Sequence, residues 1–160
     1  MSDQAIKTLV SQGLAAMKAG SKVAEKATSE IQNDAKDAGL KAALEQGNQT
    51  ASQWKQRIDQ AAGEVGGVDE IDNKILQAHF EVSKEIRRKA QDDESRDLGI
   101  IASGQMALHY WIAAFGTMKS YAGKAGLSNV EQAMQTSVEE AKKADQAHTE
   151  LAQTIMRQAA

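Results

Sequence analysis

Hydrophobic positions in the first part of the chain recur at helical spacing. From Ile6 onward the apolar residues, including the adjacent Leu9 and Val10, recur in steps of three, four or seven positions, which places them on one face of a helix. These residues are Ile6, Leu9, Val10, Leu14, Met17, Ala24 and Ile31. The pattern predicts a long first helix that begins at Ser2 or Asp3, two residue types that favour helix N-caps.

A second helical pattern ends at a pair of glycines. Its apolar positions are Leu40, Leu44, Ala51, Trp54, Ile58, Ala61 and Val65. Gly66 and Gly67 follow directly, and glycine accepts the left-handed backbone that commonly ends a helix. We therefore expect the first two helices to run antiparallel to each other.

Three further helices are predicted in the second half of the chain. Residues 69–91 are predicted to form a more polar helix that crosses the bundle as a connector. The acidic run 92–94 is interpreted as a solvated turn. Residues 95–124 form the most apolar helix. Ser128 begins the last helix, with Glu131 three positions later in the arrangement of a capping box.

The apolar stretch 98–118 has two interpretations. Apart from His109 it carries no residue that can be charged, and at about 1.5 Å per residue it is long enough to cross a bilayer. Polar residues interrupt it, however, and a membrane helix would leave the amphipathic helices without a partner for their apolar faces. We expect a central helix of a bundle and no membrane span.

Composition and charge narrow the class of protein. The 160 residues include no proline and no cysteine, so the chain suits one all-α domain over residues 1–160 and excludes disulfides and thiolate sites. The net charge is -3, and basic and acidic residues are scattered along the chain, which argues against nucleic acid as a partner. The N-terminus lacks the features of a signal peptide, and we expect a cytoplasmic protein.

Several short motifs together resemble one family. They are Arg57-Ile58-Asp59-Gln60, Arg96-Asp97, His109-Tyr110 followed by Ile112, Phe115-Gly116-Thr117, and Glu139-Glu140 with Lys142 and Asp145. With the order of the helices, these motifs resemble the YciE/YciF family of bacterial ferritin-like proteins. The resemblance implies an all-α, ferritin-like up-down four-helix bundle with an additional connecting helix between helices two and three.

The resemblance also implies a pair of metal ions held by Glu and His side chains inside the bundle, yet this chain has other residues at the corresponding positions. The replaced ligand positions are Ser21, Gly47, Gln49, Thr50, Ser52, Leu108, Trp111 and Ala141. A buried divalent ion needs anionic oxygens and imidazoles close by. We therefore expect no metal and no other cofactor.

Four residues remain as candidates for a reduced metal site: His109, Glu139, Glu140 and Asp145. We interpret His109 as a structural histidine hydrogen-bonded to one of the other three. We expect Glu139 and Glu140 to face solvent, with an inward-facing Glu45 or Glu140 as the alternative. His79 and His148 lie among polar residues and are interpreted as surface or rim side chains. No two histidines stand at the i, i+4 spacing of a metal site.

The aromatic residues have two interpretations. In the first, the aromatic residues fill the core and a helix–helix dimer surface; these are Trp54, Tyr110, Trp111, Phe115 and Tyr121. In the second, Trp54, Leu108, Trp111 and Phe115 line an apolar pocket for a small ligand in the space where the family holds metal.

Three functions follow from these interpretations. The leading hypothesis is a non-enzymatic, metal-free, stress-related bundle that acts as a homodimeric structural or binding module. The second is a residual metal-dependent oxidase or peroxide scavenger around His109 and its acidic neighbours. The third is a protein of lipid or granule surfaces that binds through the first helix, which carries Lys7, Lys18, Lys22 and Lys26.

Overall fold

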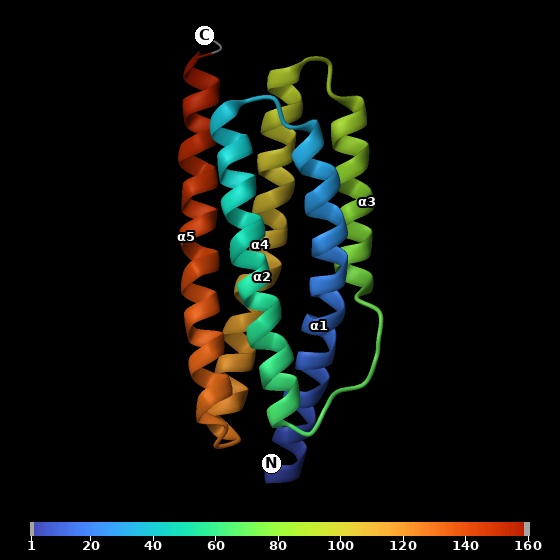
Figure 1. Ribbon diagram of the computed structural model, residues 1–160, viewed down its shortest axis with the longest axis vertical. Coiled ribbons are helices and arrows are strands. Elements are labelled where there is room, and N and C mark those ends of the chain that lie inside the picture. The colour runs from blue at the N-terminus through green and yellow to red at the C-terminus, as the bar shows by residue number, and fades with distance from the viewer. Residues whose placement is uncertain (1, 159–160) are drawn as a thin grey trace.

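Five helices make up the computed structural model, which describes residues 2–158. They are α1 (Asp3–Asp34), α2 (Ala38–Glu64), α3 (Lys74–Lys89), α4 (Asp93–Lys124) and α5 (Ser128–Gln158). Figure 1 shows the four long helices side by side, with the shorter α3 packed against α1 and α4. The predicted all-α bundle with a connecting helix is confirmed.

The connecting helix sets the direction of the chain. The segment after α2 crosses the end of the bundle to α3, which carries the chain back to the opposite end, where α4 begins (Figure 1). Helices α1 and α2 are therefore antiparallel, as are α4 and α5, whereas α2 and α4 run in the same direction. Arg87 of α3 is buried and forms ion pairs with Glu30 and Asp34 of α1, which fix α3 against the bundle.

The ends of the helices mostly follow the sequence signals. Ser2 caps α1, since its Oγ accepts a hydrogen bond from the backbone N–H of Ala5 at 3.2 Å. Gly66 and Gly67 have φ angles of 85° and 96°, the left-handed conformation expected after α2. Gly126 has a φ of 73° in the turn between α4 and α5.

The capping box lies at a different helix from the predicted one. Glu131 donates its backbone N–H to the carbonyl of Leu127, and among residues 2–158 no capping hydrogen bond involves the side chain of Ser128. The box is formed instead at α4, where Asp92 and Ser95 exchange hydrogen bonds. The acidic run 92–94 is therefore the start of α4 rather than a separate turn, because carboxylates stabilise the positive end of a helix.

Apolar side chains from all the long helices form the core. The larger cluster surrounds Trp54, Trp111 and Phe115, and a smaller one near the α1–α2 turn contains Leu40, Ile101 and other aliphatic residues. The apolar face of α1 is part of this core, since Ile6, Val10, Leu14 and Met17 are buried. In the folded bundle that face is not available for a lipid surface, contrary to the third hypothesis.

Helix α4 is long and apolar enough to cross a membrane, judged by length and composition alone. It packs against α1, α3 and α5 in the bundle. One side of α4 nevertheless faces outside the bundle, where Met106 and Ala113 are exposed together with His109 and Thr117.

Replacing Gly47 with alanine is expected to raise the free energy of unfolding by about 0.5–1 kcal/mol, because glycine inside a helix is entropically costly. A Cβ at Gly47 would meet no atom within 4 Å. Gly20→Ala is the contrasting variant, since its Cβ would lie 2.9 Å from both Asn73 Nδ2 and Leu76 Cδ1. Urea unfolding should show that the first substitution stabilises and the second destabilises; a loss of stability in Gly47→Ala would contradict this account.

Candidate functional site

A cavity of about 470 Å³ lies between the helices of the bundle, and all five helices contribute to its wall. Its apolar wall includes Val23 from α1, Leu44 and Trp54 from α2, Phe80 from α3, and Leu108 and Trp111 from α4. Small side chains such as Ala51, Ala107 and Ala144 leave the space that the larger residues surround. The cavity has the size and apolar character of sites that bind small molecules.

Three of the four residues expected to line an apolar pocket do so. Trp54, Leu108 and Trp111 belong to the wall, whereas Phe115 does not. Phe115 is fully buried and stacks on Trp111 with ring centroids 5.3 Å apart. It also meets Trp54 edge to face, with ring centroids 5.1 Å apart, so Phe115 packs against both indole rings.

The positions identified as replaced metal ligands do not all share one site. Gly47, Thr50, Leu108 and Trp111 line the cavity. Ser21 is buried beside it, where its Oγ donates to the carbonyl of Met17, and Ala141 is fully buried in the core. Gln49 and Ser52 lie on the exposed face of α2 and do not line the cavity.

The residues present do not fit the paired metal ions that the family resemblance implies. Within residues 2–158, no three His, Asp or Glu side chains come together as a group that could hold a metal ion. His109 contacts Asp145 at 3.2 Å, one of its three expected partners, but its side chain is 67% exposed. Glu139 is also exposed and accepts a hydrogen bond from Gln135. His109 and Glu139 lie at the surface, the side chain of Asp145 is 23% exposed, and none of the three lines the cavity.

Glu140 faces inward, contrary to the sequence-based expectation, and its charge is matched by an arginine. Two nitrogens of the Arg57 guanidinium donate to its two carboxylate oxygens at 2.6 and 3.0 Å, and the indole N–H of Trp54 donates at 2.8 Å. The hydrogen bond from Arg57 is the main cause that lowers the pKa of Glu140, and the Trp54 bond adds to it. Because Arg57 supplies the positive charge, Glu140 needs no metal ion.

Two histidines that sequence reasoning assigned to the surface or rim belong to the cavity wall. His79 of α3 lies 2.8 Å from the carbonyl oxygen of Ser103 through Nε2, and His148 of α5 lies 2.8 Å from the carbonyl of Ala144 through Nδ1. Both imidazoles are only partly exposed. Their rings are held in place by these backbone contacts, so each presents a fixed polar edge.

Several polar residues of the wall were not assigned to a site from the sequence, among them Asn48, Ser83 and Ser103. Ser83 follows Phe80 by three positions and Asn48 follows Leu44 by four, which puts each pair on one helical face. Neither Phe80 nor Leu44 was a predicted pocket residue, so this spacing alone did not point to the cavity.

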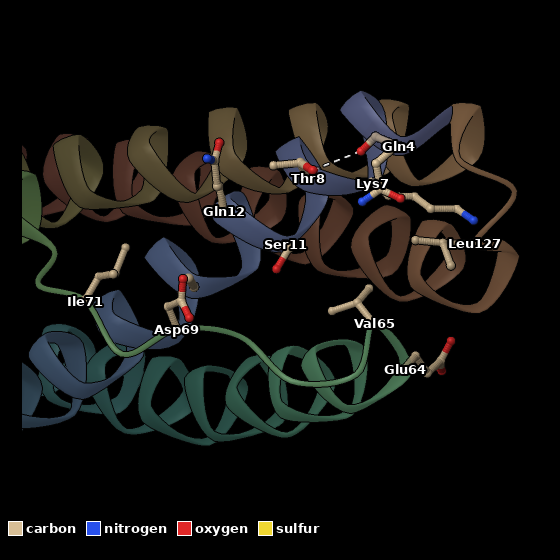
Figure 2. A pocket seen from close by; sticks show the side chains of 11 residues that line it. Gln4, Lys7, Thr8, Ser11, Gln12, Glu64, Val65, Asp69, Ile71 and Leu127 are labelled. Atoms are coloured by element: carbon tan, nitrogen blue, oxygen red, sulfur yellow. Dashed lines mark hydrogen bonds between the residues drawn. The ribbon is translucent and has the colours of Figure 1, made fainter. Parts of the chain in front are cut away.

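A second and larger hollow lies near the beginning of α1. Figure 2 shows its side chains, which come mainly from α1 and from the segment after α2. Most of these residues are exposed and polar, and Lys7, Glu64 and Asp69 mix both signs of charge. Thr8 uses its hydroxyl within α1, donating to the carbonyl of Gln4 at 2.9 Å. This hollow is a surface depression without convergent groups, so we take the interior cavity as the candidate site.

The comparisons with known proteins agree with this architecture. Residues 6–160 match the model of the family described as "Domain of unknown function (DUF892)". The E. coli stress protein YciF superposes with a TM-score of 0.90 at 21% identity, covering 95% of this chain and 97% of that chain. YcfI, a putative structural protein from Rhodopseudomonas palustris, superposes with a TM-score of 0.86 at 21% identity, covering 90% and 92% of the two chains.

The curated proteins include no match to the sequence. At 21% identity the two structural neighbours establish the fold alone. The family model, in contrast, spans nearly the whole chain, and the expected resemblance is confirmed. This chain therefore belongs to the DUF892 family and has the ferritin-like helical bundle of YciF.

Proposed function

We propose that this protein is a metal-free ferritin-like bundle that binds a small, mainly apolar molecule between its helices. The observation that carries the proposal is the apolar cavity itself, whose wall includes Leu108 and Trp111 at positions where the family resemblance implies metal ligands. The similarity to YciF, described as a stress protein, supports a role in the stress response of the cell. The protein acts by binding rather than by catalysis.

Metal content is the first test. Protein purified without chelator should contain far less than one equivalent of iron, manganese or zinc, because Arg57 already compensates Glu140 and the other two acidic candidates, Glu139 and Asp145, do not line the cavity. Elemental analysis together with the protein concentration measures this directly. One or two tightly held ions per chain would refute the metal-free proposal.

Ligand binding is the second test, and the two tryptophans report on it. Trp54 and Trp111 are the only tryptophans of the chain, and both line the cavity. A non-absorbing ligand such as 1-octanol should therefore shift or quench their emission in a saturable way. Isothermal titration would measure the affinity independently.

Two adjacent alanines offer a matched pair of variants. Ala43 lines the cavity, whereas Ala42 is exposed on the same helix. Ala43→Phe should weaken binding of 1-octanol about tenfold, because the ring takes up space that the ligand needs, and Ala42→Phe should leave it unchanged. Equal binding by both variants, or no binding by the wild type, would contradict the proposed function.

We further propose that the bundle is a homodimer that pairs through α4. The exposed side of α4 carries Ala102, Met106, which is 50% exposed, and Ala113, together with the polar residues His109 and Thr117. A second copy of the chain would bury this face, which is otherwise in contact with water.

Light scattering after gel filtration tests the dimer. The wild type should have twice the mass of one chain, and Met106→Glu should be monomeric because it places a charge in the interface. Met156→Glu on α5 is the control, since Met156 is equally exposed at 51%. A monomeric wild type, or a Met106→Glu variant that stays dimeric, would rule out this interface.

A further inference from the structure

The interior cavity opens to solvent along the seam between α2 and α5, two helices that lie side by side in Figure 1. Among residues 2–158, most of those that line the cavity are buried or half-buried, and four are exposed. Two of the exposed ones belong to α2 and two to α5: Gln46, Gly47, Lys143 and Ala147. The wall residues from α1, α3 and α4 are all covered, so the mouth of the cavity lies between α2 and α5.

The two helices meet on either side of this mouth. Toward one end of the seam, a Cβ added at Gly39 of α2 would lie 3.1 Å from Cδ1 of Leu151 in α5. Toward the other end, Trp54 and Arg57 of α2 donate hydrogen bonds to the carboxylate of Glu140 in α5. The opening is therefore confined to the middle of the seam.

Small residues keep the middle of the seam open. A Cβ added at Gly47 would meet no atom within 4 Å. Ala144 and Ala147 occupy the corresponding part of α5, and both line the cavity. The opening thus leads from solvent to Trp54 and Trp111 in the interior.

Lys143 gives the mouth a net positive charge. Besides histidines, the residues of the wall that carry charge are Glu140 and Lys143. Arg57 neutralises Glu140 through two hydrogen bonds at 2.6 and 3.0 Å. Lys143, in contrast, is exposed and forms no ion pair with any residue from 2 to 158. Its charge is left to act on a molecule that lies in the mouth.

Resting on the proposed function, we infer that the cavity takes up single-chain amphiphiles with an anionic head group, such as a medium-chain carboxylate. The apolar chain lies inside against Trp54, Leu108 and Trp111, and the head group stays in water at the mouth beside Lys143. An anion in this position remains hydrated, so the cost of burying its charge does not arise. The ammonium group of Lys143 attracts such a head group and repels a cationic one.

Three octyl compounds test the inference with the wild-type protein: octanoate, octylammonium and 1-octanol. At about pH 7.5 the first is an anion and the second a cation. Titrations at low salt, followed by tryptophan emission, should give about fivefold tighter binding for octanoate than for octylammonium, because exposed charge pairs contribute modestly. This preference should shrink at high salt, which screens the charge of Lys143.

Variants of two adjacent lysines identify the charge involved. Lys143→Met should abolish the preference for octanoate, and Lys143→Glu should reverse it. Both variants should bind 1-octanol as the wild type does, because its hydroxyl group carries no charge. Lys142→Glu is the matched control and should keep the wild-type preference, since Lys142 is exposed on the same helix but does not line the cavity.

A second cation on the other side of the mouth tests where the head group lies. Gln46 of α2 is exposed and lines the cavity, so Gln46→Lys should strengthen the binding of octanoate about threefold. Gln49→Lys should leave it unchanged, since Gln49 is exposed on the same helix outside the wall. An equal effect of the two substitutions would contradict a head group held between α2 and α5.

The outcomes separate the two proposals. Binding of 1-octanol without a preference for octanoate over octylammonium would overturn the inference about the head group and leave the proposed apolar binding intact. A preference that survives in folded Lys143→Met would overturn it too. If none of the three compounds binds, the proposed function falls together with the inference. Circular dichroism verifies that each variant is folded, and the comparison in the wild type depends on no variant.

Discussion

Replacing Asp97 with alanine should lower the free energy of unfolding by about 3 kcal/mol, since hydrogen bonds to a buried charged group are strong ones. Asp97 lies in the first turns of α4 and is buried. Its carboxylate accepts from the backbone N–H of Lys36 at 2.9 Å and from that of Asp37 at 2.6 Å. One side chain thus holds the turn between α1 and α2 against the beginning of α4.

Urea unfolding followed by circular dichroism measures this effect. Asp97→Asn should be intermediate, because the amide keeps one acceptor oxygen but loses the charge. Asp59→Ala is the control, since its ion pair with Lys55 at 3.1 Å is exposed and such pairs contribute about 0.5 kcal/mol. A loss below about 1 kcal/mol for Asp97→Ala would show that water replaces the carboxylate at the turn.

The example of Asp97 shows what the sequence reveals and what it hides. The Arg96-Asp97 motif contributed to the family resemblance, but its partners lie about sixty positions earlier in the chain. Local periodicity reports which face of a helix is apolar. It does not report which backbone groups of a distant turn that face will meet.

The helices themselves were predictable, and the reason is their regular spacing of apolar residues. The buried face of α1 and the left-handed Gly66 and Gly67 followed directly from the sequence. The capping box was assigned to the wrong helix because Ser128 and Asp92 carry similar capping signals, and only the structure shows which one forms the box.

The cavity was predictable only in part. Trp54, Leu108 and Trp111 stood out because large apolar residues occupied positions that the family resemblance assigned to ligands. His79 and His148 were placed outside because their sequence neighbours are polar. A cavity forms where the side chains of several helices together leave space unfilled. Here the small residues Ala51, Ala107 and Ala144 leave that space, and it cannot be recognised from the pattern of any one helix.

Replacing Glu140 with glutamine should lower the free energy of unfolding by about 2 kcal/mol at neutral pH, because it breaks a partly buried, bidentate ion pair with Arg57. The Glu140 side chain is 28% exposed and that of Arg57 is 23% exposed, so solvent screens the pair only partially. Glu139→Gln is the matched control, since the neighbouring Glu139 is exposed and has no ion pair in residues 2–158. Its effect should stay within about 0.5 kcal/mol. The emission of Trp54 should change in the first variant only, because its indole N–H donates to Glu140.

The pH dependence of the stability difference between wild type and Glu140→Gln identifies the charge of Glu140 as its cause. Arg57 lowers the pKa of Glu140 from its ordinary value of 4.5, so the folded protein holds the ionised form more strongly than the unfolded chain does. The contribution of Glu140 to stability is therefore complete above about pH 4.5 and is lost as the pH falls through the lowered pKa of the folded state. Urea unfolding of wild type and Glu140→Gln should give a constant difference between pH 6 and 8, and the two curves should converge in acid. A difference that persists unchanged well below the ordinary pKa would mean that Glu140 acts through its shape and neutral hydrogen bonds, and that its pair with Arg57 contributes little to holding the cavity wall.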